Sequence, residues 1–269
     1  MIFFSNAKIN IGLNVVSKRD DGFHNIETII YPIGLSDVIE INTSEKFELI
    51  NTGIAVNDKI ENNLCYKAYN LLQQKHDLPP IKIHLQKIVP FGAGLGGGSS
   101  NASFILKAVN ELFGLQLSNE KLKTYASQIG SDCTFFIENK PAIATQKGDI
   151  LEYIDLNLSE YTIVIIYPNI IINTTLAYKN ANPKMPDISL KESIKFPVNK
   201  WKEKIKNDFE KSIFKQYPVI KNIKEKLYKK GAAYASLSGS GSSVYGIFEK
   251  DINLESEFKE FFYWKSKML

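Results

Sequence analysis

The feature that most constrains this chain is a cluster of glycines at residues 92–98. Five of these seven positions are glycine, and the surrounding segment reads PFGAGLGGGSSNAS. Alternating apolar residues at 81–89 predict a strand before the cluster, and helically spaced apolar residues predict a helix from about Ser99. In such a setting, backbone N–H groups and the start of the helix can bind phosphate. Because packing alone rarely needs so many glycines, we predict a phosphate-binding loop rather than a tight structural turn.

Two common kinds of phosphate loop fit this segment poorly. A Walker A loop needs a lysine directly after its last glycine, but the first lysine after the cluster is Lys107. A dinucleotide-binding fingerprint is formally satisfied by Gly92, Gly94 and Gly97. However, the acidic residue expected about 20 positions later falls inside the predicted helix, and no β-α-β pattern follows.

A third kind of loop, that of the GHMP small-molecule kinases, matches closely. Its proline, its Gly-Leu-Gly step and its serine pair resemble Pro90, Gly94–Gly96 and Ser99–Ser100. The resemblance covers essentially the whole chain, because SNAKINIGLNVVSKRDDGFHNIETI, GLGGGSSNA, GSDCTFF and SLSGSGSSVYGIF follow one another in the family's order. The triple glycine and DGFHNIET resemble the branch that acts on a cytidine diphosphate conjugate of methylerythritol. The sequence lacks the Gly-Glu-His-type segment expected near the N-terminus of mevalonate kinases and galactokinases.

The resemblance implies a reaction and its cofactors. It implies ATP-dependent phosphorylation of the 2-hydroxyl of 4-diphosphocytidyl-2-C-methylerythritol in the non-mevalonate route to isoprenoid precursors. Mg²⁺ is expected with ATP. Since no dedicated cluster of acidic ligands is visible in the sequence, we expect ATP and a loop serine such as Ser99 to hold the ion.

Two residues match the family's catalytic pair. Asp132 matches the aspartate that would accept the proton of the substrate hydroxyl, and Lys8 matches the lysine that would keep this aspartate ionised and polarise the hydroxyl. Without the resemblance, Asp132 reads as a helix N-cap and Lys8 as a solvated strand lysine. Thr134 is a departure, because the family usually has proline near this position.

The resemblance also assigns the substrate and nucleotide contacts. Substrate contacts are expected from Asn10, Phe23, His24, Thr174 and Tyr178; relatives usually have tyrosine where Phe23 stands, and an isolated Phe23 reads as a core residue. The ATP contacts are expected from Pro90, Gly92, Ala93, Gly94, Leu95, Gly96, Gly97, Gly98, Ser99 and Ser100, with Asn63 and Leu64 at the adenine. A second glycine turn, with Gly239 and Gly241, would close over the phosphates or form a simple hairpin.

The predicted fold is α+β with two domains, residues 1–157 and 158–269. The first would carry a sheet, the glycine loop and its helices, and the second would resemble a ferredoxin-like sandwich. Strands are expected at 8–16, 37–42, 81–89, 142–145, 150–154, 161–168 and on both sides of 236–243; helices are expected near 61–76, 99–113, 118–130, within 200–230, and at the C-terminal end.

Composition argues against several other functions. The chain has 33 basic and 29 acidic residues, but Arg19 is its only arginine, which disfavours nucleic-acid binding. Cys65 and Cys133 are too few for a disulfide framework and form no zinc motif. The start of the chain lacks a signal-peptide pattern, and the apolar run at 161–172 is shorter than the roughly 20 residues of a membrane span. We expect a cytoplasmic enzyme without an obligate protein partner.

Two other functions remain open at this point. The chain could be another GHMP kinase, acting on homoserine, mevalonate or a sugar. It could also be an inactive nucleotide-binding module that keeps the fold, although the presence of both Lys8 and Asp132 argues against this.

Overall fold

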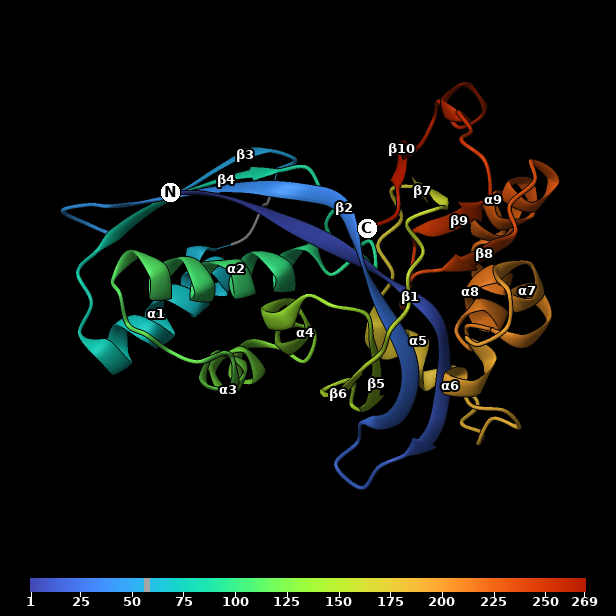
Figure 1. Cartoon of the computed structure of the whole chain (residues 1–269), viewed down its shortest axis with the longest axis horizontal. Helices are drawn as coiled ribbons and strands as arrows, with labels where there is room; N and C mark the ends of the chain where they lie inside the picture. The colour runs from blue at the N-terminus through green and yellow to red at the C-terminus, as the bar shows by residue number, and fades with distance from the viewer. Residues whose placement is uncertain (56–58) are drawn as a thin grey trace. The chain divides into compact units, whose positions relative to one another are not determined.

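The computed structural model describes residues 1–55 and 59–269, which form two compact units (Figure 1). Unit 1 consists of Met1–Ala7, Leu35–Phe91 and Gly96–Lys140, and unit 2 of Lys8–Gly34, Gly92–Leu95 and Pro141–Leu269. Strands β1 (Ile2–Lys18) and β2 (His24–Thr43) therefore run through both units. The units are interleaved along the chain, unlike the consecutive domains 1–157 and 158–269, whose boundary stays a prediction.

Unit 1 packs helices on a small sheet. The second half of β2 pairs antiparallel with β4 (Ile81–Lys87), and β4 pairs parallel with β3 (Glu48–Gly53). In Figure 1, α1 (Leu64–His76) and α2 (Gly97–Leu112) lie along one side of these strands. The alternation predicted for β4 is confirmed, because its apolar residues are buried with those of the helices, namely Ile81, Ile83, Leu85, Ala68, Leu72, Ile105, Leu106 and Val109.

Local signals in the sequence explain where the helices of unit 1 begin and end. Asn63 caps α1, since its side chain accepts a hydrogen bond of 2.9 Å from the backbone N–H of Cys65. Ser118 caps α3 (Asn119–Ile129) in the same way, at the start of the helix expected near 118–130. Gly114 follows α2 with a φ of +60°, a conformation that glycine adopts readily. The short α4 (Cys133–Glu138) closes the unit.

Unit 2 contains the first half of β2 and a separate four-stranded sheet. The first half of β2 pairs antiparallel with β5 (Ala142–Gln146), which pairs with β6 (Ile150–Tyr153). The other sheet has the order β10-β7-β9-β8, formed by β7 (Thr162–Tyr167), β8 (Tyr234–Leu237), β9 (Val244–Phe248) and β10 (Phe262–Lys267). This antiparallel order is that of a ferredoxin-like sandwich, which confirms the predicted architecture of the second half.

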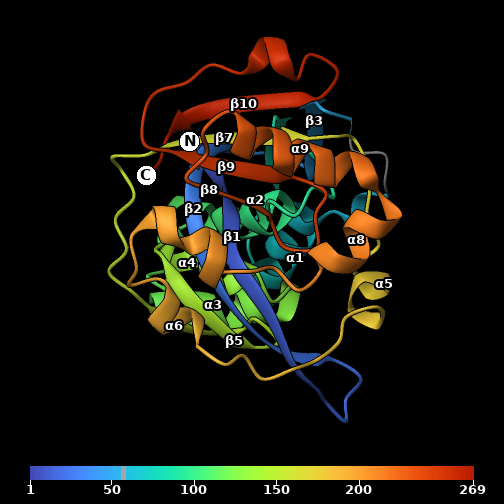
Figure 2. The same ribbon diagram turned by 90° about the vertical axis from the view of Figure 1, so that its right-hand side faces the viewer.

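Helices cover one face of this second sheet. Figure 2 shows α9 (Pro218–Lys229) in front of the strands and α8 (Glu210–Gln216) beside it. The apolar side of α9 packs against the sheet, and Leu13 and Val15 of β1 join the same core. Its buried members include Val164, Ile166, Ile220, Ile223, Leu227, Leu237 and Val244. The exposed side of α9 is lysine-rich, as an amphipathic helix requires.

The helix predicted at the C-terminal end is wrong. The segment after β9 forms only the 3-10 turn Glu255–Glu257 and then strand β10. The sequence FYWKSK has aromatic residues that favour strands, and β10 pairs antiparallel with β7 along its whole length. Pairing with the buried strand β7 thus decides the structure of this segment.

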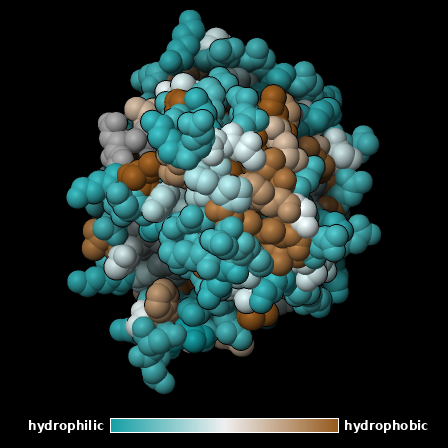
Figure 3. Space-filling model, turned by 90° about the vertical axis from the view of Figure 1, so that its left-hand side faces the viewer, coloured by the Kyte–Doolittle hydropathy of each residue, from teal (hydrophilic) through white to brown (hydrophobic). Residues whose placement is uncertain are grey.

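The remaining elements are short connections. They are α5 (Thr174–Lys179), α6 (Leu190–Ser193), α7 (Trp201–Lys204) and the 3-10 turns Ile60–Asn62 and Val198–Lys200. Figure 3 shows the face of the molecule at the left of Figure 1, where hydrophilic residues predominate around a smaller hydrophobic area. Within the described part of the chain, no helix is long and apolar enough to span a membrane.

Candidate active site

The glycine loop lies between β4 and α2, where the sequence predicts it. Gly92, Gly94 and Gly96 have φ values of +64°, +79° and +70°, which side-chain-bearing residues rarely adopt. At Gly94 the space is restricted as well, because a Cβ atom would lie 2.1 Å from the carbonyl oxygen of Ser238. Both the backbone conformation and the close approach therefore require glycine at this position.

In unit 2, the central part of the glycine loop is held by β1 and by the second glycine turn. The Ser238 hydroxyl donates to the carbonyl of Gly94 at 2.8 Å, and the backbone N–H of Ser243 donates to Ala93 at 3.1 Å. On the other side, the backbone N–H of Lys8 donates to the carbonyl of Leu95 at 3.0 Å. The structure thus brings together three segments that are widely separated in the sequence.

The second turn has its own anchor. Gly239 and Gly241 have φ values of +56° and +88°. The buried side chain of Asn207 donates to the carbonyls of Leu237 and Gly239 at 3.0 and 2.8 Å. This turn is therefore more than a hairpin connection between β8 and β9, because the hydrogen bonds of Ser238 and Ser243 attach it to the glycine loop.

In unit 1, a buried ion pair holds the strand that enters the glycine loop. Asp37 pairs with Lys87 and also accepts hydrogen bonds from the backbone N–H groups of Ile88 and Val89 at 2.6 and 2.8 Å. The side chain of Asn101, on α2, donates to the same carboxylate at 2.9 Å. Asp37, Lys87 and Asn101 thus fix the end of β4 to the first turns of α2. These three residues are not predicted from the sequence, where their only signal is that they are polar residues in largely apolar elements.

The first turn of α2 presents its free backbone N–H groups beside the loop. Gly97 must remain small, because a Cβ atom there would lie 2.9 Å from both Lys87 Nζ and Val89 Cγ1. Ser100 is fully buried, and its hydroxyl has no hydrogen-bond partner in the structure. A helix N-terminus with an unpartnered hydroxyl is suited to an anionic group such as phosphate.

The two residues expected at the adenine lie next to this turn. Asn63 is the N-cap of α1. Leu64 is close to the glycines, since its Cδ1 would lie 3.6 Å from a Cβ atom on Gly98. Both residues are in unit 1 with the start of α2.

Asp132 is placed by contacts between α2 and α4. It occupies the N-cap position of α4, as an interpretation without the resemblance expects, but its side chain makes no capping hydrogen bond to the helix. Ser103, on α2, donates to the carbonyl of Cys133 at 2.7 Å, and Lys107 donates to the carbonyl of Phe136 at 3.0 Å. Because α2 also begins at the glycine loop, one helix sets the position of Asp132 relative to the loop serines. In this turn, the hydroxyl of Thr134 donates to the carbonyl of Ser131 at 2.9 Å.

Burial changes the acid–base properties of the groups around α4. It raises the pKa of the Cys133 thiol to about 11, although the hydroxyls of Ser99 and Ser103 partly oppose this shift. It lowers the pKa of the Lys107 ammonium to about 8, with Glu138 acting in the opposite direction. The thiol beside Asp132 therefore stays protonated at neutral pH and is a poor nucleophile.

Lys8 and Asn10 form a buried pair in β1. Their side chains are 5% and 4% exposed, so Lys8 is not a solvated strand lysine. Lys8 Nζ donates to Asn10 Oδ1 at 2.6 Å. The backbone of Asn10 is held as well, because its N–H donates to the Ser238 hydroxyl at 3.3 Å and its carbonyl accepts from Tyr245 at 2.9 Å. Burial raises the pKa of Tyr245 well above its usual value, so this hydroxyl remains a donor.

Phe23 lies in the turn between β1 and β2. It is 60% exposed and thus not a core residue, and Lys147 Nζ lies 5.5 Å from its ring centroid. Arg19 and Asp21 brace the turn through a salt bridge of 3.0 Å, and this hydrogen bond lowers the pKa of the Asp21 carboxyl. The turn thus presents an aromatic ring to solvent, as stacking with a planar base requires.

His24 and Tyr178 lie together although 153 other residues separate them in the sequence. Their rings stack with centroids 5.2 Å apart and an interplanar angle of 16°. Phe209 supports the Tyr178 ring edge-on, at 4.9 Å. Thr174, at the start of α5, shares a hydrogen bond of 3.1 Å with Ser240 of the second glycine turn. Tyr178, a substrate residue predicted in the second half of the chain, is therefore close to His24, which is predicted in the first.

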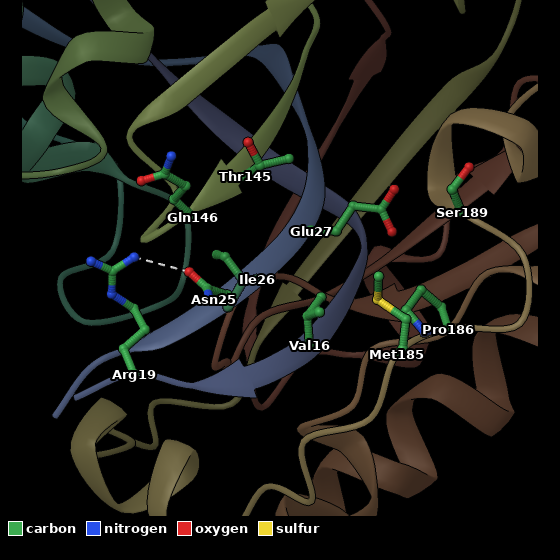
Figure 4. A pocket seen from close by; sticks show the side chains of 10 residues that line it. All are labelled: Val16, Arg19, Asn25, Ile26, Glu27, Thr145, Gln146, Met185, Pro186 and Ser189. Carbon is green, nitrogen blue, oxygen red and sulfur yellow. Dashed lines mark hydrogen bonds between the residues drawn. The ribbon is translucent and has the colours of Figure 1, made fainter. Parts of the chain in front are cut away.

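Unit 2 also contains a pocket of about 610 Å³ (Figure 4), and several of its lining residues are near Phe23 and His24 in the sequence. In Figure 4, Arg19 and Asn25 face each other, with a hydrogen bond of 3.0 Å, while Met185 and Pro186 form the opposite side. Its lining is both polar and apolar: Val16, Arg19, Asn25, Ile26, Glu27, Thr145, Gln146, Met185, Pro186 and Ser189. Three of these residues directly follow His24.

No protein metal centre is present among residues 1–55 and 59–269, since no three His, Cys, Asp or Glu side chains come together there. The oxygen donors in the first turn of α2 include the hydroxyls of Ser99 and Ser100. This donor set fits Mg²⁺ that is carried mainly by phosphate oxygens.

Comparison with known proteins gives consistent results. Residues 63–139 match the model of the GHMP kinases N terminal domain, and residues 194–263 match that of the GHMP kinases C terminal domain. The chain is 49% identical over 270 residues to a 4-diphosphocytidyl-2-C-methyl-D-erythritol kinase of Parabacteroides distasonis, covering 100% of both chains. It is 52% identical over 255 residues to the enzyme of that name from Bacteroides thetaiotaomicron, covering 93% of each.

Solved structures show the same relationship. A crystal structure of 4-(cytidine 5'-diphospho)-2C-methyl-D-erythritol kinase has a TM-score of 0.85 at 26% identity and covers 98% of both chains. A homoserine kinase from Cytophaga hutchinsonii has a TM-score of 0.68 at 16% identity, covering 98% of this chain and 95% of its own. The second likeness shows a shared fold only.

Proposed function

The chain belongs to the GHMP kinase family, in its 4-diphosphocytidyl-2-C-methyl-D-erythritol kinase branch, and we propose how its residues perform the reaction of that branch. The reaction transfers the γ-phosphoryl group of ATP to the 2-hydroxyl of 4-diphosphocytidyl-2-C-methyl-D-erythritol, in the methylerythritol phosphate route to isoprenoid precursors. The observation that carries this function is identity of 49% over the full length of both chains. Homoserine and mevalonate kinases share the fold at only 13–17% identity.

We assign ATP to the glycine loop and the start of α2. The phosphates would accept hydrogen bonds from backbone N–H groups of the loop, which glycine leaves uncovered. The positive end of a 16-residue helix favours their charge. Asn63 and Leu64 would contact the adenine, and Ser238, through its bond to Gly94, would hold the loop in the binding conformation.

We assign the chemistry to Asp132 and Lys8. Asp132 would accept the proton of the substrate hydroxyl, or orient this hydroxyl toward the γ-phosphorus. The Lys8 ammonium would stabilise the negative charge that develops on the transferred group. Because little covalent work falls to the protein in phosphoryl transfer, correct placement of these charges accounts for most of the rate enhancement.

We assign the cytidine to the aromatic group of unit 2. Phe23 would stack on the base, and His24 would donate to or accept from its polar edge. Tyr178 offers a second aromatic face, supported by Phe209, and Thr174 a hydroxyl contact. Replacement of the usual tyrosine by Phe23 keeps the stacking surface and removes one hydroxyl. Asn10 would touch the substrate with the amide hydrogen that it does not use in the protein.

Mg²⁺ would be held by the ATP phosphates and a loop hydroxyl, that of Ser99 or the unpartnered Ser100. When bound, it supplies positive charge that neutralises the phosphates. We also propose that residues 1–157 and 158–269 form the two family domains, since the matched family models fall on either side of this boundary. The reaction is assigned to the cytoplasm, where its water-soluble nucleotide substrates occur, without a nucleic acid or protein partner.

Release of ADP by the purified full-length chain tests this function. The chain is mixed with ATP and Mg²⁺ and offered the cytidyl-methylerythritol substrate, mevalonate or homoserine in parallel. We expect turnover with the first compound alone. Turnover with another acceptor instead would indicate a different GHMP kinase, and ATP binding without any turnover would indicate an inactive nucleotide-binding module.

A further inference from the structure

Thr28 of β2 contacts both Asn10 and Gly12, and each contact has a defined direction. Its side chain is 1% exposed, and its hydroxyl donates to the carbonyl of Gly12 at 2.6 Å. The side-chain nitrogen of Asn10 donates to the same hydroxyl at 3.0 Å. A threonine hydroxyl has one hydrogen, and Gly12 receives it, so toward Asn10 it acts only as an acceptor.

The acceptor at Gly12 is itself fixed by the fold. Gly12 has a φ of +71°, and a Cβ atom there would lie 2.7 Å from both Ile205 Cγ2 and Leu190 Cδ2. A side chain at this position would therefore be strained and would clash. Glycine allows the backbone of β1 to adopt this conformation, in which the Gly12 carbonyl points toward Thr28. This carbonyl determines the direction of the hydroxyl hydrogen of Thr28.

The orientation of the Asn10 amide follows from this arrangement. Its nitrogen faces Thr28, and its oxygen therefore faces Lys8, from which it accepts the bond of 2.6 Å. If the amide turned over, it would offer N–H donors to the Lys8 ammonium in place of an acceptor. Lys8 is 5% exposed, so little water can compensate for the lost bond, and the ammonium would lose the acceptor that fixes it from within β1.

We propose that Thr28 is a positioning residue for phosphoryl transfer, which fixes the amide of Asn10 and thereby the ammonium of Lys8. This proposal rests on the roles assigned above to Lys8 and Asn10. Thr28 acts through these two side chains, which are the ones assigned to the reacting groups. Its removal should therefore lower kcat and leave the KM for ATP unchanged, because the charge of Lys8 is needed in the transition state.

A double-mutant cycle tests the proposal with the full-length enzyme. Thr28→Val keeps the shape of the side chain and removes its hydroxyl, Thr28→Ser keeps the hydroxyl, and Asn10→Ala removes the amide that Thr28 orients. We expect Thr28→Val to lower kcat about tenfold, as loss of one buried hydrogen bond in the transition state would. Thr28→Ser should restore most of this rate. In the Asn10→Ala background, Thr28→Val should have no further effect.

The outcomes distinguish positioning from a merely structural role. Equal losses of kcat from Thr28→Val in both backgrounds would overturn the role of Thr28 while leaving those of Lys8 and Asn10 in place. Wild-type turnover by Asn10→Ala would overturn both. If Thr28→Val gives no folded protein, Thr28→Ala takes its place in the same cycle. Failure of the unmodified chain to phosphorylate the cytidyl substrate would contradict the function itself.

Discussion

The hydroxyl of Ser238 donates a hydrogen bond to the carbonyl of Gly94, and so joins two glycine-rich segments that are 144 residues apart in the chain. The same hydroxyl accepts a hydrogen bond from the backbone N–H of Asn10. One small side chain thus links the glycine loop, the second glycine turn and the strand that carries Lys8. Since phosphoryl transfer depends on placement, we expect changes at these contacts to affect nucleotide use as well as stability.

Gly94→Ala should weaken ATP binding and destabilise the protein. The substitution forces a side chain into a φ of +79° and places its Cβ 2.1 Å from the Ser238 carbonyl, so the loop or the turn must shift. We expect the KM for ATP to rise at least about tenfold, with a lower Tm. Gly114→Ala is the matched control, because its φ is +60° but, among the described residues, nothing beyond its chain neighbours lies within 4 Å of a Cβ atom added there. Equal changes in KM and Tm for both variants would contradict the proposed loop contact.

Asp132→Asn should abolish most turnover without weakening ATP binding. The amide has nearly the same shape as the carboxylate but cannot accept a proton or supply its charge. We expect kcat to fall by about a thousandfold, within the range of acid–base contributions. Steady-state ADP release and the KM for ATP measure the two effects. Asp187→Asn is the control, because the Asp187 side chain is 90% exposed. Turnover near the wild-type rate would remove Asp132 from the mechanism.

Phe23→Ala should raise the KM for the cytidyl substrate about tenfold, the scale of one lost base-stacking contact. The KM for ATP and the Tm should remain unchanged, since the ring is 60% exposed and supports no core. Phe23→Tyr should bind substrate at least as well as the wild type. Phe4→Ala removes a ring that is 66% exposed in unit 1 and should alter neither KM. An unchanged KM for the cytidyl substrate in Phe23→Ala would place the base elsewhere.

The contribution of Lys107 to the free energy of unfolding should increase as the pH rises from about 8 to 10.5, the usual pKa of a lysine. Burial lowers the folded-state pKa of Lys107 to about 8, so over this interval the unfolded chain binds one more proton than the folded chain. The free energy of unfolding then gains up to about 1.4 kcal/mol per pH unit from this group, while other groups add their own contributions.

Urea unfolding of the wild type and Lys107→Met at several pH values measures this contribution. The difference in unfolding free energy should change in favour of the wild type between pH 8 and 10.5 and stay level below pH 7. Lys195→Met, at a lysine whose side chain is 64% exposed, should show no such change. If the difference in unfolding free energy between the wild type and Lys107→Met does not change with pH in the alkaline range, burial does not lower the pKa of Lys107.

Periodicity predicted most of the elements because each places apolar residues on a single face. The strand alternation of residues 8–16 and 81–89 and the spacing within α1 and α2 follow this rule. The C-terminal helix was wrong because the strand β10 is decided by pairing with β7, which local spacing does not encode. The second sheet therefore has the ferredoxin-like strand order, although the connection from β9 to β10 contains only the 3-10 turn Glu255–Glu257 in place of a helix.

Only those residues of the candidate site that lie within short sequence motifs could be predicted. The glycine loop, Asp132, Lys8 and the Phe23–His24 pair lie in recognisable segments. Their supports do not, because Thr28, Ser238 and Tyr245 reach Asn10 from 18, 228 and 235 residues away. The alternation at residues 8–16 marked Lys8 as lying on a polar face, but contacts of this range bury that face too. Burial of both faces of a strand cannot be inferred from the strand itself.

The interleaving of the two units limits how this gene can be recombined. Leu13 and Val15, near the N-terminus, complete the core formed by Val164, Ile223 and Leu227. The backbone of Leu13 also exchanges hydrogen bonds with the segment 206–208. A fragment beginning at residue 158 would lack these partners and leave part of its apolar core exposed. A chimera that takes residues 158–269 from a relative would therefore also need strands β1 and β2 from that relative.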